Sequence, residues 1–188
     1  YILDLKESDD YITPVAARRY GHTDEFDDSN IILENNKICA VFDHRTMNLI
    51  SLKDKLTNKE LISKPSAIFR LIDENIVYAM TSWRVGNYMS IKNLNETQNV
   101  IVSDIKVENS LCQSVKYHLD FSERSNLAVT IKLTEDSSML EFEVMVDFHE
   151  IKGKESVPQL NFTLPVSYNV QNYRYNVPFG NIDRSEIK

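Results

Sequence analysis

The sequence predicts an all-β fold, a large antiparallel β-sandwich. Three segments alternate between apolar and polar side chains, which is the period of strands with one buried and one solvated face. No long amphipathic helix is apparent, and short polar breaks separate the strands. With only four glycines in 188 residues, most turns must use Asn and Asp, which tolerate left-handed backbone.

Residues 1–29 differ from the rest and are predicted to form a linker or a wrapping arm. The runs 7–10 and 23–29 are polar and acidic. Between them, the segment 14–20 is compatible with one or two helical turns, because Pro14 suits the first position of a helix.

From residue 30 onward strand follows strand, and we assign residues 30–188 to one β-sandwich domain. The three clearest strands are expected to bury alternate residues: Val115, Tyr117, Leu119 and Phe121; Leu127, Val129, Ile131 and Leu133; and Leu140, Phe142, Val144, Val146 and Phe148. Further strands are predicted at 37–43, 48–53, 66–72, 75–83, 86–93, 98–108 and 157–168. Several exceed immunoglobulin-type strands in length, which favours a large curved sandwich.

Composition limits the function classes. A net charge of −7 and a pI of about 5.1 argue against nucleic-acid binding and against docking on an anionic membrane. No apolar run approaches the roughly 20 residues of a spanning helix. Cys39 and Cys112 are expected to be buried thiols, although a disulfide between them stays open. Two cysteines are too few for the disulfide framework of a small secreted protein, and we expect the parent protein to be cytoplasmic.

One predicted strand carries Glu141, Glu143, Asp147 and His149 on one side. A glycosidase needs at least two carboxylates at its active site. Carboxylates at alternate positions of a strand lie about 6.5–7 Å apart. A solvated outer face is the preferred interpretation, with a sugar-contacting face and catalytic carboxylates as alternatives. We therefore assign no catalytic residue to the chain.

Two other residues are candidates for contact with carbohydrate or with another domain. Trp83 is the only tryptophan, and it is either a core residue or a platform for a sugar ring. Arg184 follows a Pro-Phe-Gly turn, which would hold it rigidly, and an Arg side chain is suited to fixed polar contacts. The alternative is that Arg184 is a simple surface charge.

The acidic segment near the N-terminus is a candidate for metal binding. It contains residue types that bind zinc, namely His22, Asp24, Asp27 and Asp28. A structural site needs four ligands on fixed elements, so a solvated linker is preferred and no metal site is predicted in this chain.

Three segments carry a resemblance to a known family. The segment 33–61 opens with Leu-Glu-Asn and ends with Leu-Ile-Ser-Leu-Lys-Asp-Lys-Leu-Thr-Asn-Lys-Glu-Leu; the segment 80–88 centres on Trp83; and the segment 175–184 contains Val-Pro-Phe-Gly and ends at Arg184. In order and spacing they resemble the C-terminal β-domain of glycoside hydrolase family 38, the α-mannosidases. The second segment, with Arg84, is more similar to the bacterial branch that includes mannosylglycerate hydrolases.

The first segment departs from the family at two positions where the family has Gly. Asn58 stands at one of them and is a physical substitute, because Asn accepts a positive φ. Met47 stands at the other, and we expect the next residue, Asn48, to take the left-handed conformation instead.

The resemblance implies a super-sandwich of the galactose-mutarotase type within an enzyme that hydrolyses terminal α-mannosides with retention. It also implies a zinc ion and an Asp nucleophile in an N-terminal α/β domain, which would precede Tyr1. The chain would then be a non-catalytic piece, truncated at both ends and inactive alone. Its expected partners are that catalytic domain and a mannoside carbohydrate, with no cofactor of its own, no nucleic acid and no membrane. The alternatives are an independent carbohydrate-binding module and a plain interaction domain.

Overall fold

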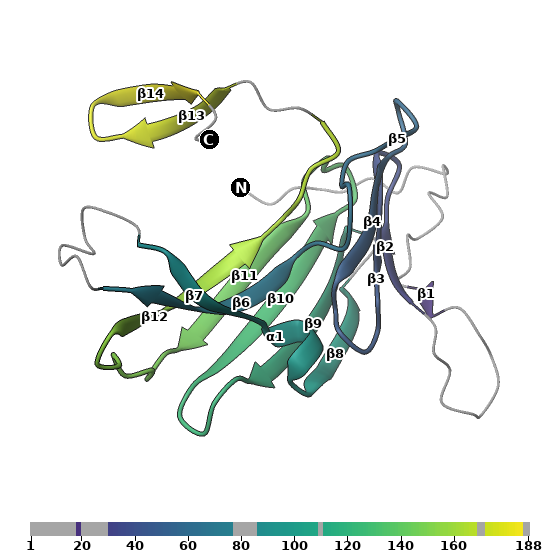
Figure 1. Cartoon of the computed structure of the whole chain (residues 1–188). Helices are drawn as coiled ribbons and strands as arrows, with labels where there is room; N and C mark the ends of the chain where they lie inside the picture. The colour runs from purple at the N-terminus through teal and green to yellow at the C-terminus, as the bar shows by residue number, and fades with distance from the viewer. Residues whose placement is uncertain (1–17, 20–29, 77–85, 109–110, 169–171, 186–188) are drawn as a thin grey trace, which may run out of the picture.

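A computed structural model of the chain describes residues 18–19, 30–76, 86–108, 111–168 and 172–185. The predicted all-β antiparallel architecture is confirmed, because helix in these residues is limited to the single turn of α1 (Leu94–Thr97). Every strand pair is antiparallel. Figure 1 shows the arrangement of the sheets.

The strands form three sheets and a hairpin. The five-stranded sheet has the order β1 (Arg18–Arg19), β2 (Ile31–Glu34), β3 (Ile38–Phe42), β4 (Leu49–Asp54), β5 (Lys59–Glu60). The four-stranded sheet has the order β11 (Glu141–Asp147), β10 (Asn126–Thr134), β9 (Cys112–Asp120), β8 (Val100–Glu108). The three-stranded sheet has the order β12 (Ser156–Thr163), β6 (Ile68–Asn75), β7 (Tyr88–Asn93), and the hairpin joins β13 (Asn172–Val177) to β14 (Gly180–Ser185).

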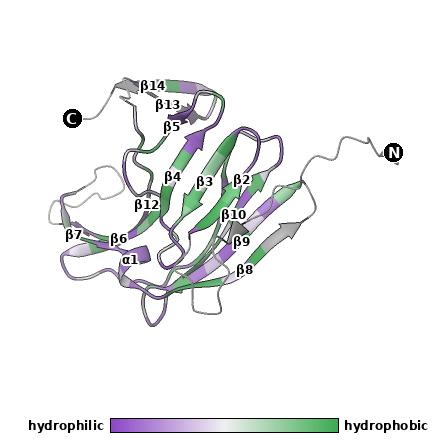
Figure 2. Ribbon diagram, turned by 90° about the vertical axis from the view of Figure 1, so that its right-hand side faces the viewer, coloured by the Kyte–Doolittle hydropathy of each residue, from purple (hydrophilic) through white to green (hydrophobic). Residues whose placement is uncertain are grey.

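The core lies on the inner face of the four-stranded sheet. Alternate residues of β9 and β10 are buried there, as the alternation predicts: Val115, Tyr117, Leu119, Leu127, Val129, Ile131 and Leu133. They share one apolar cluster with residues of the five-stranded sheet, including Leu33, Phe42 and Leu49, and with Phe69 of β6. Figure 2 shows the hydrophobic stretches of β3 and β10 that supply part of this core. Two layers therefore face each other, as in a sandwich.

Three boundaries differ from the expectations. Arg18–Arg19 does not belong to a helical turn; it pairs with Ile31 and Ile32 and adds an edge strand to β2. The sequence predicted one strand at 66–72 and a second at 75–83. The break between them was wrong, because β6 continues through its polar end to Asn75. Glu74 is buried there and accepts hydrogen bonds from the Gly86 N–H and the Gln159 side chain. Residues 77–83 lie outside the described part.

The strand predicted at 157–168 ends at Thr163 because the chain crosses to the five-stranded sheet. The Ser63 N–H donates to the Pro165 carbonyl (3.2 Å), and the Ser167 N–H donates to the Leu61 carbonyl (3.0 Å). Because the backbone after Thr163 forms these hydrogen bonds with residues outside β6, β12 ends at Thr163.

The turn between β3 and β4 corrects a further expectation. Met47, not Asn48, is the residue with positive φ (54°), while Asn58 takes a positive φ (57°) as predicted. The Met47 side chain is fully buried, and its N–H donates to the Asp43 carbonyl at 2.7 Å. Burial of a large apolar side chain outweighs the roughly 1–2 kcal/mol cost of left-handed backbone.

Candidate functional site

The two residues predicted to contact carbohydrate or another domain, Trp83 and Arg184, fall wholly or partly outside the described residues. Trp83 lies outside the described residues, as do His22, Asp24, Asp27 and Asp28. The backbone of Arg184 lies in β14 and pairs with Tyr173, but its side chain is outside the described part. Figure 1 shows the β13–β14 hairpin beside one end of the sandwich.

The acidic side of β11 faces solvent. Glu143 forms an ion pair with Lys132 (2.7 Å), and the Asp147 carboxylate lies 2.7 Å from His149 Nε2. The hydrogen bond and the charge of Lys132 lower the pKa of Glu143. A general acid needs a raised pKa and a pocket that excludes water, so this arrangement has the chemistry of a solvated outer face.

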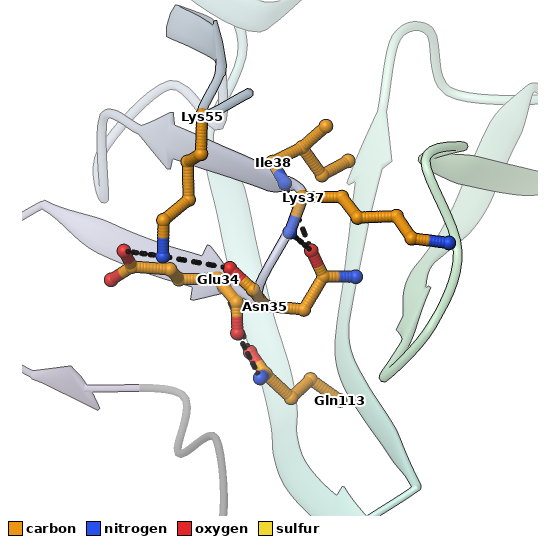
Figure 3. Close-up of polar contacts among 6 residues, drawn as sticks. All are labelled: Glu34, Asn35, Lys37, Ile38, Lys55 and Gln113. Carbon is orange, nitrogen blue, oxygen red and sulfur yellow. Dashed lines mark hydrogen bonds and ion pairs between the residues drawn. The ribbon is translucent and has the colours of Figure 1, made fainter. Parts of the chain in front are cut away.

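The Leu-Glu-Asn segment forms a connection between the two layers (Figure 3). Asn35 is buried at the turn between β2 and β3, where its Oδ1 accepts from the N–H groups of Lys37 (2.8 Å) and Ile38 (2.9 Å). Its Nδ2 donates to the carbonyls of Thr134 (2.7 Å), the last residue of β10, and of Ser137 (2.8 Å), which follows that strand. One side chain thus satisfies four backbone groups from both layers.

Gln113 extends the same connection from β9. Its Nε2 donates to the Glu34 carbonyl (2.6 Å), and its Oε1 accepts from the Glu34 N–H (3.1 Å). The Lys55 ammonium bonds to the Glu34 carboxylate (2.9 Å) and to the Asn35 carbonyl (2.8 Å). These hydrogen bonds hold β2, β9 and the end of β4 together, so the cluster stabilises the contact between the two layers.

An apolar groove lies between β11 and β12. It encloses about 350 Å³ and is lined by Phe69, Phe142, Val144, Leu160, Asn161 and Phe162. The ring of Phe162 lies 5.0 Å from that of Phe69 and 5.4 Å from that of Phe142, centroid to centroid. The groove therefore joins the inner faces of two different sheets.

The apolar face of β11 is less buried than its alternation predicted. Val144 is 38%, Val146 42% and Phe148 38% exposed, and across the groove Phe162 is 41% exposed. These residues continue the core face of β10, since Val144 pairs with Val129 and Val146 with Leu127. Both β11 and β12 end their sheets in the described part, where this apolar face stays partly exposed.

The lining of the groove determines what it can bind. Asn161 is the one residue of its lining with a polar side chain. A mannoside carries several hydroxyl groups, each of which costs free energy if buried without a hydrogen bond. Apolar side chains of a protein are a better match, and the exposed face has the character of an interface.

Two further properties concern metal ions and membranes. Among the described residues, no three His, Cys, Asp or Glu side chains gather in a way that could hold a metal ion. The short helix seen in this part of the chain could not span a bilayer.

The two cysteines are free and half-buried, whereas full burial was expected. Desolvation, followed by the charge of Glu34, raises the pKa of the Cys39 thiol.

Comparison with known proteins identifies the family. The model of the glycosyl hydrolases family 38 C-terminal domain matches residues 33–188, which covers most of the chain. A search of curated proteins finds no match. The matched region includes the Asn35 connection, both strands of the apolar groove and the β13–β14 hairpin. The chain therefore belongs to the family of glycosyl hydrolase family 38 C-terminal domains.

Proposed function

We propose that this chain is a non-catalytic β-domain of an α-mannosidase that hydrolyses terminal α-mannosides with retention. In this proposal the domain packs on an N-terminal catalytic domain of the same polypeptide and helps to shape its active site. The observation that carries the proposal is the exposed apolar face of β11 and β12 in a domain of this family. Interdomain contacts commonly bury about 600–1,500 Å², and such a face is suited to one.

The zinc ion and the Asp nucleophile of the proposed reaction belong to the catalytic domain. In this proposal the chain itself carries no catalytic step. Its proposed contribution is to hold the catalytic domain in position and to complete the wall of the site.

A narrower assignment concerns the branch of the family. Arg84 follows Trp83 in a segment that resembles the bacterial members that include mannosylglycerate hydrolases. We propose that the parent enzyme belongs with them and that Trp83 and Arg184 contact the carbohydrate or the neighbouring domain.

The experiment is an assay of the complete polypeptide that contains this chain. We expect it to cleave a chromogenic α-mannoside, with the first-formed sugar retaining the α configuration by NMR. Replacement of Val144 by Asp should place a charge in the interface and lower the activity, whereas Thr130→Asp on the solvated side of β10 should not. Inversion, or absence of α-mannosidase activity, would contradict the proposal.

A further inference from the structure

One edge of β11 has no strand paired to it among the described residues. In the part of the chain that the structure describes, β11 pairs with β10 alone. An edge strand of this kind presents N–H and C=O groups in the geometry of a sheet ladder, which another strand can complete. The edge spans Glu141–Asp147, long enough for a full-length strand.

The two faces of β11 specify the side chains of an added strand. Phe142 and Val144 line the groove and Val146 lies on the same face of the strand, so the inward side chains of an added strand would be apolar. The opposite face carries three carboxylates and one methionine: Glu141, Glu143, Met145 and Asp147. Directly opposed charges of opposite sign stabilise strand pairs, so the outward side chains of the added strand would be basic. Lys132 of β10 lies directly opposite Glu141 and forms an ion pair with the diagonal neighbour Glu143.

A second copy of this chain fits the edge poorly. Antiparallel pairing of two β11 strands about Val144 would set Glu141 opposite Asp147 of the copy, twice. Pairing about Glu143 would set that residue opposite itself. Like charges directly opposed destabilise a strand pair, so the outer face selects against a dimer through this edge.

We propose that the free edge of β11, together with the apolar groove, receives one extended strand in which apolar and basic side chains alternate. The proposal rests on the proposed function in one respect, because it assigns that strand to the catalytic domain of the same polypeptide. The strand would extend the four-stranded sheet and cover Phe142, Val144 and Val146.

A synthetic peptide tests the chemistry of the strand on the 188-residue chain. The probe is a blocked, fluorescently labelled peptide as long as β11 in which Val and Lys alternate. Its controls are the Val–Glu peptide and two Val–Lys peptides with N-methyl groups on one or the other set of alternate residues. We expect saturable binding of the Val–Lys peptide, weaker at high salt, and loss of binding for one N-methylated peptide only. Equal binding of the Val–Glu peptide, no binding, or indifference to both methylation patterns would overturn the proposal.

Variants separate the two faces. Glu141→Gln combined with Asp147→Asn should weaken binding about three- to tenfold without unfolding the chain, because it removes charges at the exposed outer face. Val144→Thr, which nearly preserves shape, should weaken it through the groove. Unchanged affinity in both variants, with circular dichroism like that of the parent chain, would show that the peptide binds elsewhere and overturn the assignment.

Hydrogen exchange tests the source of the strand. Amides of β11 that exchange quickly in the 188-residue chain should be protected in the complete polypeptide at low concentration. Equal exchange in the two proteins would refute docking of a strand from the catalytic domain. The α-mannosidase assay judges the proposed function separately, since activity without protection of β11 would leave that function in place.

Discussion

Asn35 forms hydrogen bonds with four backbone groups while it is almost fully buried. Its replacement by Ala leaves two N–H groups and two carbonyls without these partners, in a place where water cannot easily replace them. We expect Asn35→Ala to lower the free energy of unfolding by about 3–5 kcal/mol, measured by urea denaturation. Asn126→Ala, at an exposed position, is the control. A loss below about 1 kcal/mol would contradict the role of Asn35 as a connection between layers.

Met47 and Asn58 both have positive φ but differ in burial, so Gly should affect them differently. Gly removes the backbone strain at either position, but at Met47 it also removes a fully buried side chain. We expect Met47→Gly to destabilise by about 2–4 kcal/mol, since the cavity outweighs the relief of strain. At the exposed Asn58, the same change should stay within about 1 kcal/mol. Thermal unfolding of the two variants side by side tests this, and equal effects would refute the explanation.

At the scale of elements, the turn from β3 to β4 depends on an ionised Asp43. Burial acts to raise its pKa, but hydrogen bonds from the Thr46 N–H (2.8 Å), the Thr46 hydroxyl (2.8 Å) and the Arg45 N–H (3.1 Å) lower it below the ordinary 3.8. A pKa lowered by folding stabilises the folded state above the unfolded pKa, and that stability is lost as pH falls.

We therefore expect the free energy of unfolding to decrease as the pH is lowered from about 5 toward 2. Asp43→Asn keeps an acceptor but cannot titrate, so it should reduce this slope. Thr46→Val removes one donor and should reduce it less. Urea unfolding at several pH values measures the slopes, and an unchanged slope in Asp43→Asn would contradict the role given to this carboxylate.

The strands were largely predictable because alternation reports directly on burial in a half-solvated sheet. β9 and β10 bury every second residue as their sequences indicate. The exact position of the left-handed residue in the β3–β4 turn was not predictable, because it depends on the pocket that receives the Met47 side chain. The continuation of β6 into Glu74 was missed for a similar reason: a buried carboxylate is tolerated only where distant residues such as Gln159 donate to it.

At the scale of the whole molecule, the candidate interface could not be predicted from sequence. Its groove forms where Phe69, Phe142 and Phe162 meet from three separate strands. Alternation in β11 indicated an apolar face but not that this face would stay partly exposed. The family resemblance was accessible from three short segments, and the family match confirms it over residues 33–188.

The most direct test of the central claim, that this is a non-catalytic domain of an α-mannosidase, is an assay of the 188-residue chain alone. The purified chain is incubated with a chromogenic α-mannoside, with and without added zinc, beside the complete polypeptide. Retaining hydrolysis needs two carboxylates about 5–5.5 Å apart in a protected pocket. We expect turnover by the complete polypeptide and none by the chain alone. Turnover by the chain that survives repurification, and that disappears in Glu141→Gln or Glu143→Gln, would contradict the account.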